Sequence, residues 1–218
     1  MQTENKSYTL QEAGWKVRIQ PPAEKSAARS MLLLHGWTGD ETVMWIFTAK
    51  LPSNYWLFAP RGQVDSPGGG YGWLPHTGSL PMLDDFAQPA RDLIDAFQQW
   101  SEDTGAPQSP VDVMGFSQGA AMAYALAAFY PDRIGRVIAL AGFLPEVDTL
   151  PGRYDALRGK HVYIAHGTRD ETVPVEKSQT AVRVLGDAGA DVTYCESDVG
   201  HKLSADCLRG LAEFMRSE

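Results

Sequence analysis

The stretch 111–122 constrains the fold of this chain more than any other. A short apolar run leads into Gly115-Phe116-Ser117-Gln118-Gly119, and an alanine-rich run of helical type follows without a break. In so sharp a turn the central residue is strained and the helix packs close to the strand. Side chains two positions either side would therefore collide, which explains the two glycines. The sequence predicts a strand, a tight turn that holds Ser117 above the sheet edge, and a helix.

The rest of the chain repeats this alternation of strands and helices. Continuous apolar runs predict strands buried on both faces, helical spacing predicts the helices, and an alternating run at 15–19 predicts an edge strand. The buried strands are expected at 30–34, 55–59, 111–116, 136–141, 161–165 and 192–195, and the helices at 41–50, 83–100, 118–129, 176–188 and 203–215. Pro89 predicts a kink or a broken helix start. The pattern is typical of an α/β fold with a mostly parallel sheet and helices on both faces.

Two segments are expected to lack this regularity. Residues 61–81 are rich in Gly, Pro and aromatic residues and predict a long functional or mobile loop, and residues 143–159 predict a loop with a short helix. No large insertion interrupts the strands, so no large cap domain is expected. A length of 218 residues predicts one domain over 1–218, with flexibility allowed for residues 1–12.

Composition narrows the class of partner. With 27 acidic and 19 basic residues, the net charge of −8 argues against binding to nucleic acid or to anionic membranes. The polar N-terminus and the lack of a run of membrane length predict a cytoplasmic protein without stable membrane insertion. Cys195 and Cys207 are interpreted as reduced thiols, with a bridge as the alternative. The oligomeric state is left open, a homodimer included.

Ser117 is the candidate nucleophile, because the positive end of a helix favours a developing anion there. A serine hydroxyl needs a base, and the chain holds five histidines. His201 lies between the last strand and the last helix, which should bring it to the sheet edge that carries Ser117. His35 fits better as a residue that orders the loop beside the site.

The base in turn needs an acid that fixes its tautomer. Asp170 follows a predicted strand, and the order Ser117, Asp170, His201 is the one found in one class of hydrolase. Glu171 and Asp198 are alternative acids, and Asp198 is close to His201 in sequence.

These motifs resemble those of the α/β-hydrolase superfamily, and within it the compact carboxylesterase group that includes the phospholipase/carboxylesterases and acyl-protein thioesterases. The resemblance rests on Leu34–Asp40 (LHGWTGD), Gly115–Gly119 (GFSQG), His166–Pro174 (HGTRDETVP) and Gly200-His201. It implies an α/β-hydrolase fold, with Ser117 as nucleophile, His201 as general base and then acid, and Asp170 as its orienting acid. It also implies an oxyanion hole made by the backbone N–H groups of Trp37 and Gln118.

The resemblance to the family says least about the substrate-binding surface. Where the group often carries Trp-Phe-Asp, this chain reads Tyr71-Gly72-Trp73-Leu74-Pro75, and Asp198-Val199 precede the histidine motif. A shallow site is expected, without a cationic pocket and with apolar walls formed by Trp37, Trp73, Phe143, Leu144 and Val173. The predicted partner is accordingly a small-molecule ester with a neutral short-to-medium acyl group.

The sequence thus predicts a serine carboxylesterase that works through an acyl-enzyme and needs no metal or cofactor. Alternatives with the same three residues are a thioesterase, a lysophospholipase, or a hydrolase of lactones or carbon–carbon bonds. An alternative of another class is a non-catalytic homologue that binds a small apolar ligand.

Overall fold

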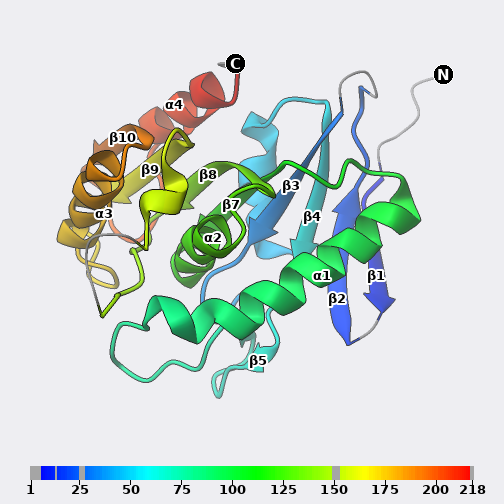
Figure 1. Ribbon diagram of the computed structural model, residues 1–218, viewed down its shortest axis with the longest axis horizontal. Helices are drawn as coiled ribbons and strands as arrows, with labels where there is room; N and C mark the ends of the chain where they lie inside the picture. Colours follow the sequence, from blue (N-terminus) through cyan, green and yellow to red (C-terminus); the bar gives the residue numbers. More distant parts are fainter. Residues whose placement is uncertain (1–5, 13, 25–27, 149–152, 217–218) are drawn as a thin grey trace.

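The fold is built around an eight-stranded sheet with the strand order β1-β2-β4-β3-β7-β8-β9-β10 (Figure 1). The computed structural model describes residues 6–12, 14–24, 28–148 and 153–216. β1 (Tyr8–Glu12), β2 (Trp15–Gln20) and β4 (Tyr55–Pro60) pair antiparallel in that order. The remaining neighbours pair parallel: β3 (Arg29–Leu34) with β4 and β7 (Val111–Phe116), then β8 (Ile134–Leu140), β9 (His161–Gly167) and β10 (Asp191–Ser197). The predicted, mostly parallel sheet is confirmed.

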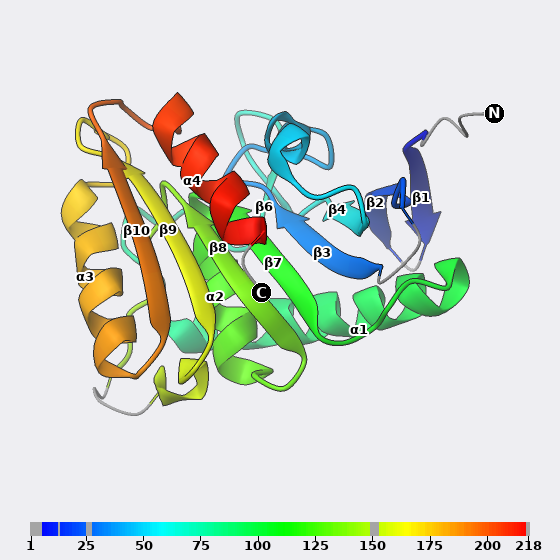
Figure 2. The same ribbon diagram turned by 90° about the horizontal axis from the view of Figure 1, so that it is seen from above.

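Helices cover both faces of the sheet, as predicted (Figure 2). One face carries α1 (Ala87–Thr104), α2 (Gln118–Phe129) and α3 (Val175–Asp187), and the other carries η1 (Val43–Lys50) and α4 (Ala205–Arg216). Successive residues of a strand point to opposite faces. In β3, Leu32 and Leu34 pack into the core beneath α1 and α2, while Met31 and Leu33 pack beneath η1 and α4. This is why the central strands carry apolar residues on both faces.

Several boundaries differ from the sequence prediction. The run at 15–19 was expected at the sheet edge, but β1 pairs outside it, so β2 is an inner strand. The helix expected at 41–50 is a 3₁₀ helix that starts at Val43. The helix expected at 83–100 has the broken start predicted by Pro89: η2 (Leu83–Phe86) precedes α1, which continues to Thr104. Residues 61–81 are not all loop, because β5 (Val64–Asp65) and β6 (Tyr71–Gly72) form a small antiparallel pair.

Some predictions fall partly on residues outside those described. Of the 143–159 segment, residues 149–152 lie outside, and the predicted short helix is η3 (Asp155–Leu157). Of the segment 1–12, residues 1–5 lie outside, and residues 8–12 form β1. Within the described ranges no insertion forms a cap domain, and no helix there is long and apolar enough to cross a membrane.

Candidate active site

Ser117 lies between β7 and α2, at the carboxyl edge of the sheet. Its backbone is in the left-handed half of conformational space, with φ 52° and ψ −118°, and its N–H donates to the carbonyl of Leu140 at 2.9 Å. A Cβ on Gly115 would come within 2.0 Å of the carbonyl oxygen of Gly119, and one on Gly119 within 2.1 Å of that of Leu34. No side chain fits in such gaps, so the predicted reason for the two glycines is confirmed.

His201 contacts Asp170, as the sequence order suggested. The imidazole Nδ1 lies 2.7 Å from Asp170 Oδ2. The other carboxylate oxygen, Oδ1, accepts the backbone N–H groups of Thr172 and Val173 at 2.9 Å each. Asp170 is 7% exposed, and His166 Nε2 lies 3.3 Å from its Oδ2. These contacts fix the carboxylate, and with it the ring orientation of His201.

The two alternative acids lie elsewhere. Glu171 is exposed. Asp198 is also exposed and forms an ion pair with Arg169, its Oδ1 lying 2.6 Å from the arginine Nε. Of the three carboxylates considered from the sequence, only Asp170 is placed against His201. The opposite side of the imidazole packs on Phe116, with 4.8 Å between ring centroids.

Ser117 and His201 line the same cavity of about 1310 Å³. Trp37, Phe143 and Val173 line it too, as predicted, but Trp73 and Leu144 do not. Trp73 is 2% exposed and lies behind the wall, because its indole N–H donates to the carbonyl of His35 at 2.7 Å.

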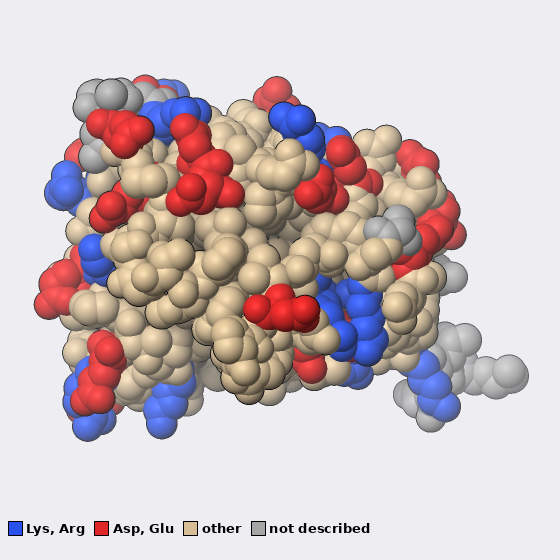
Figure 3. Space-filling view, turned by 90° about the horizontal axis from the view of Figure 1, so that it is seen from below, with Lys and Arg blue, Asp and Glu red and all other residues tan. Residues whose placement is uncertain are grey.

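The sequence prediction missed several apolar residues that line this cavity, namely Val43, Met44, Ile46 and Phe47 of η1, with Leu74, Leu80, Leu203 and Leu208. Ile46 is 76% exposed. An exposed large apolar side chain beside a cavity is a signal of binding, but the sequence does not show which apolar residues are exposed. The arrows of β3 and β4 in Figure 1 point to the side shown in Figure 3, which has a broad uncharged area, with acidic side chains just below the middle of the view and basic ones to their right.

The segment 35–39, which was expected to supply part of the oxyanion hole, is held by hydrogen bonds. His35 Nδ1 lies 2.7 Å from the carbonyl of Gly36, and the N–H of Gly62 donates to His35 Nε2 at 2.9 Å. Because Nε2 accepts, Nδ1 is the protonated nitrogen of a neutral ring. Burial lowers the pKa of His35, which favours the same neutral form. His35 therefore orders this segment, as proposed from the sequence.

Gln118 joins the serine turn to the aromatic loop through its side chain. Its Oε1 accepts the N–H of Trp73 at 2.8 Å, and its Nε2 donates to the carbonyl of Leu74 at 2.9 Å. The sequence prediction assigned this residue only a backbone role. The two side-chain hydrogen bonds add a second role, because they fix the position of the loop next to Ser117.

A buried carboxylate supports the same region from below. Glu41 forms ion pairs with Lys16 at 2.9 Å and with Arg61 at 2.7 Å, and Arg61 also donates to the hydroxyl of Tyr71 at 2.9 Å. Burial acts to raise the pKa of Glu41, but hydrogen bonds from Arg61 and Lys16 outweigh it and lower the pKa to about 2. This cluster ties β2, the end of β4 and β6 together.

Lys177 and Lys202 are further lining residues of the cavity. The sequence prediction expected no cationic pocket, and on this point it was wrong. The error arose because Lys177 lies on α3 and Lys202 in the loop after β10, far apart in sequence, and only the fold brings them to one cavity.

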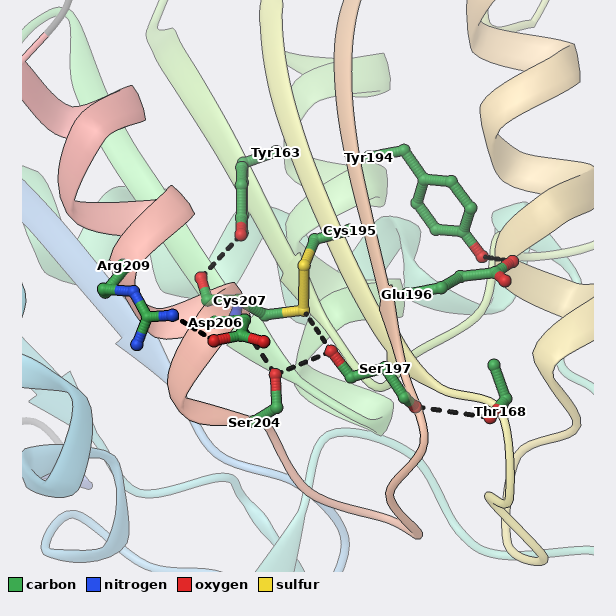
Figure 4. The surroundings of a disulfide bond; sticks show 10 residues. All are labelled: Tyr163, Thr168, Tyr194, Cys195, Glu196, Ser197, Ser204, Asp206, Cys207 and Arg209. Atoms are coloured by element: carbon green, nitrogen blue, oxygen red, sulfur yellow. Dashed lines mark hydrogen bonds and ion pairs between the residues drawn. A yellow bond between two sulfur atoms is a disulfide. The ribbon is translucent and has the colours of Figure 1, made fainter.

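The two cysteines are bonded, which corrects the interpretation as reduced thiols. Cys195 of β10 and Cys207 of α4 form a disulfide, with 5.6 Å between their Cα atoms (Figure 4). Next to it, the hydroxyls of Ser197 and Ser204 lie 2.6 Å apart. The bond closes the segment that carries His201. Because disulfides persist mainly in oxidising compartments, the cytoplasmic location stays a prediction only.

The sheet, the strained turn at Ser117 and the helices on both faces are together those of an α/β-hydrolase. A family model described as Phospholipase/Carboxylesterase matches residues 16–218, and the chain therefore belongs to this family.

Individual relatives are distant in sequence but similar over most of their length. A protein of Oryza sativa subsp. japonica named probable carboxylesterase Os04g0669500 is 27% identical, covering 94% of this chain and 85% of the relative. Acyl-protein thioesterase 1 of Saccharomyces cerevisiae is also 27% identical, covering 91% of this chain and 94% of the relative. The crystal structure of a carboxylesterase from Mesorhizobium loti superposes with a TM-score of 0.83 at 21% identity, covering 99% of this chain and all of that one.

Proposed function

We propose that this chain is a serine carboxylesterase that hydrolyses short-to-medium acyl esters through an acyl-enzyme. The observation that carries the proposal is the contact between His201 Nδ1 and Asp170 Oδ2, which lie 2.7 Å apart. His201 lines the same cavity as Ser117, whose backbone is strained. Membership of the phospholipase/carboxylesterase family, with carboxylesterase and thioesterase relatives, supports hydrolysis of an ester or thioester.

In the first half-reaction Ser117 Oγ attacks the ester carbonyl, and His201 Nε2 accepts the hydroxyl proton. Asp170 accepts the Nδ1–H of His201 and stabilises the imidazolium that forms. The negative charge on the carbonyl oxygen is stabilised by the backbone N–H groups of Trp37 and Gln118. His201 then donates its proton to the leaving oxygen, and the alcohol departs from the acyl-enzyme.

In the second half-reaction His201 Nε2 removes a proton from water, and the hydroxide formed attacks the acyl carbonyl. The same two N–H groups stabilise the second tetrahedral oxygen, and the carboxylic acid leaves as Ser117 regains its proton from His201. His35, Trp73 and the side chain of Gln118 take no part in proton transfer. They hold the two N–H donors and the cavity wall in place.

The apolar lining contributed by η1 and by Leu74 and Leu80 supports an acyl group as the part of the substrate that it binds. A thioester is the second candidate bond, because the yeast relative is named a thioesterase and the same acyl-enzyme would form. Chromogenic esters of increasing acyl length, with the matching acyl thioesters, distinguish these cases. We expect kcat/KM for esters to peak at a short-to-medium acyl length, and a preference for thioesters at every length would reassign the function.

A fluorophosphonate probe tests the serine mechanism directly. The wild-type protein should be labelled at Ser117, and Ser117→Ala should lose both the label and about six orders of magnitude in kcat. Ser53→Ala is the matched control, since Ser53 is exposed and does not line the cavity. Labelling that survives in Ser117→Ala, or a folded wild-type protein that is never labelled, would contradict the proposal.

A further inference from the structure

Two lysines line the active-site cavity without a carboxylate partner. Lys177 is half-buried and Lys202 is exposed, and neither forms an ion pair with a described residue. Asp85 is the acidic side chain among the described lining residues. The cavity beside Ser117 therefore has an excess of positive charge, although the chain as a whole carries −8.

The lack of a carboxylate partner for these lysines does not reflect a shortage of carboxylates, because the chain has 27 acidic and 19 basic residues. Several basic side chains elsewhere in the described chain pair with a carboxylate. The pairs are Lys16 and Arg61 with Glu41, Arg29 with Asp112, Arg153 with Asp84, Arg169 with Asp198, Arg183 with Asp187, and Arg209 with Asp206. Half-buried Lys160 has no ion pair, but its ammonium donates to the carbonyl of Ile134 at 2.7 Å. Lys177 is half-buried too, and no described residue accepts a hydrogen bond from its ammonium, which loses hydration without gaining a partner from the protein.

Both lysines belong to the segments that carry the acid and the base. Lys202 directly follows His201, and Lys177 lies in the first turn of α3, just after the Asp170–Pro174 segment. Most of the apolar lining comes from other segments, above all η1 and residues 74–81, which are called here the apolar part of the cavity. Val173 and Leu203 are apolar lining residues close in sequence to the lysines. The cavity thus combines this apolar part with two lysines on the segments that carry Asp170 and His201.

Because His201 hands its proton to the leaving oxygen in the proposed function, the leaving half of the substrate lies next to this residue. We propose that the leaving alcohol or thiol carries a carboxylate or phosphate group, which Lys177 and Lys202 bind, while the neutral acyl half occupies the apolar part. The inference rests on the proposed function and names its substrate class: esters whose leaving group is anionic.

Matched butyrate esters test this inference. O-Butyrylglycolate carries a carboxylate on the leaving half, and O-butyrylglycolamide is its neutral counterpart of nearly equal size. A phosphate arm pairs 2-butyryloxyethyl phosphate with 2-hydroxyethyl butyrate. Release of butyric acid at constant pH gives kcat/KM for each ester. We expect the anionic member of at least one pair to exceed its neutral partner by about tenfold at low salt, and 0.5 M NaCl to reduce that ratio several-fold.

The double variant Lys177→Gln/Lys202→Gln should bring the ratio of anionic to neutral ester down towards one. Arg91→Gln removes one positive charge from an exposed residue outside the cavity and should leave the ratio unchanged. Comparing ratios between variants cancels the different chemical reactivities of the esters. If the ratio is one or less in the wild type, or is the same in the double variant, the inference is wrong.

Esters that carry the charge on the acyl half provide the last comparison. Monomethyl succinate carries its carboxylate on the acyl side, with methyl butyrate as the neutral partner. A lysine-dependent preference for monomethyl succinate alone would place the anion in the wrong half and overturn the inference. Failure of the proposed function looks different, because no ester, neutral or anionic, would then be hydrolysed.

Discussion

Removal of the Cys195–Cys207 disulfide should cost both stability and activity. The bond joins β10 to α4 across a sequence separation of 12 residues, and His201 lies six residues from either cysteine. The Ser197–Ser204 contact at 2.6 Å, and the N–H of Cys207, which donates to Ser204 Oγ at 3.1 Å, remain when the sulfurs are reduced. Most of the stability effect therefore comes from the unfolded chain, which regains the freedom of an open loop.

The magnitude follows from the length of that loop. Closing a loop of this size removes unfolded-state entropy worth about 3 kcal/mol at 25 °C. For a chain of 218 residues each kcal/mol moves Tm by about 2–4 °C, so the expected loss is about 6–12 °C. We also expect kcat to fall more than KM rises, because the loosened segment carries His201 and leaves the apolar part of the cavity in place.

Thermal unfolding followed by circular dichroism measures the first effect, and hydrolysis of a neutral chromogenic ester measures the second. The samples are the oxidised protein, the protein refolded with a phosphine reductant, and the variant Cys195→Ser/Cys207→Ser with and without reductant. The variant should match the reduced protein and be insensitive to reductant. Intact mass reports the redox state, since reduction adds two hydrogens. A Tm change below about 2 °C on full reduction would refute the loop argument, and two free thiols in oxidised protein would refute the bond.

Three further predictions concern the site and the residues that support it. Asp170→Asn should lower kcat about four orders of magnitude by favouring the wrong tautomer of His201, whereas Asp198→Asn should cost little. A larger loss for Asp198→Asn than for Asp170→Asn in steady-state assays would reassign the acid. Gln118→Leu leaves the buried N–H of Trp73 and the part-buried carbonyl of Leu74 without partners, so urea unfolding should show a loss of about 2–4 kcal/mol. An unchanged midpoint would contradict the proposed role of the Gln118 side chain in holding the loop. The pKa of Glu41 is depressed to about 2, so its ion pairs stabilise the fold fully above about pH 4.5. This stabilisation is lost as the pH falls towards 2. The Tm of Glu41→Gln should therefore lie below the wild-type Tm at pH 7 and converge with it at pH 2.

The sequence was most informative where local packing leaves one solution. The α2 bounds 118–129 were predicted residue for residue, because two glycines and a buried strand leave only one way to turn there. β1 escaped prediction for the opposite reason. Tyr8–Glu12 is mostly exposed, so it has no pattern of burial, and its backbone pairing with β2 is what makes it a strand.

The sequence alone could not predict the contacts between segments that are distant in the chain. Cys195 and Cys207 meet only because α4 packs on the face of the sheet near β10, a fact of tertiary structure. Trp73 was expected to line the site as an aromatic residue in a functional loop. Its indole N–H instead finds a buried acceptor, the carbonyl of His35, and this turns the ring inward.

The same contacts show which part of the 61–81 loop can gate the cavity. Its first half is tied down at three points: the N–H of Gly62 donates to His35, the N–H of Tyr71 to the carbonyl of Gly39, and the N–H of Trp73 to Gln118. Opening the part up to Trp73 would break hydrogen bonds that also hold His35 and Gln118. Residues 75–79 are exposed and line the cavity beyond these anchors. For the proposed function we therefore infer that only residues 75–81 of this loop control substrate size, and that the part up to Trp73 serves as a scaffold.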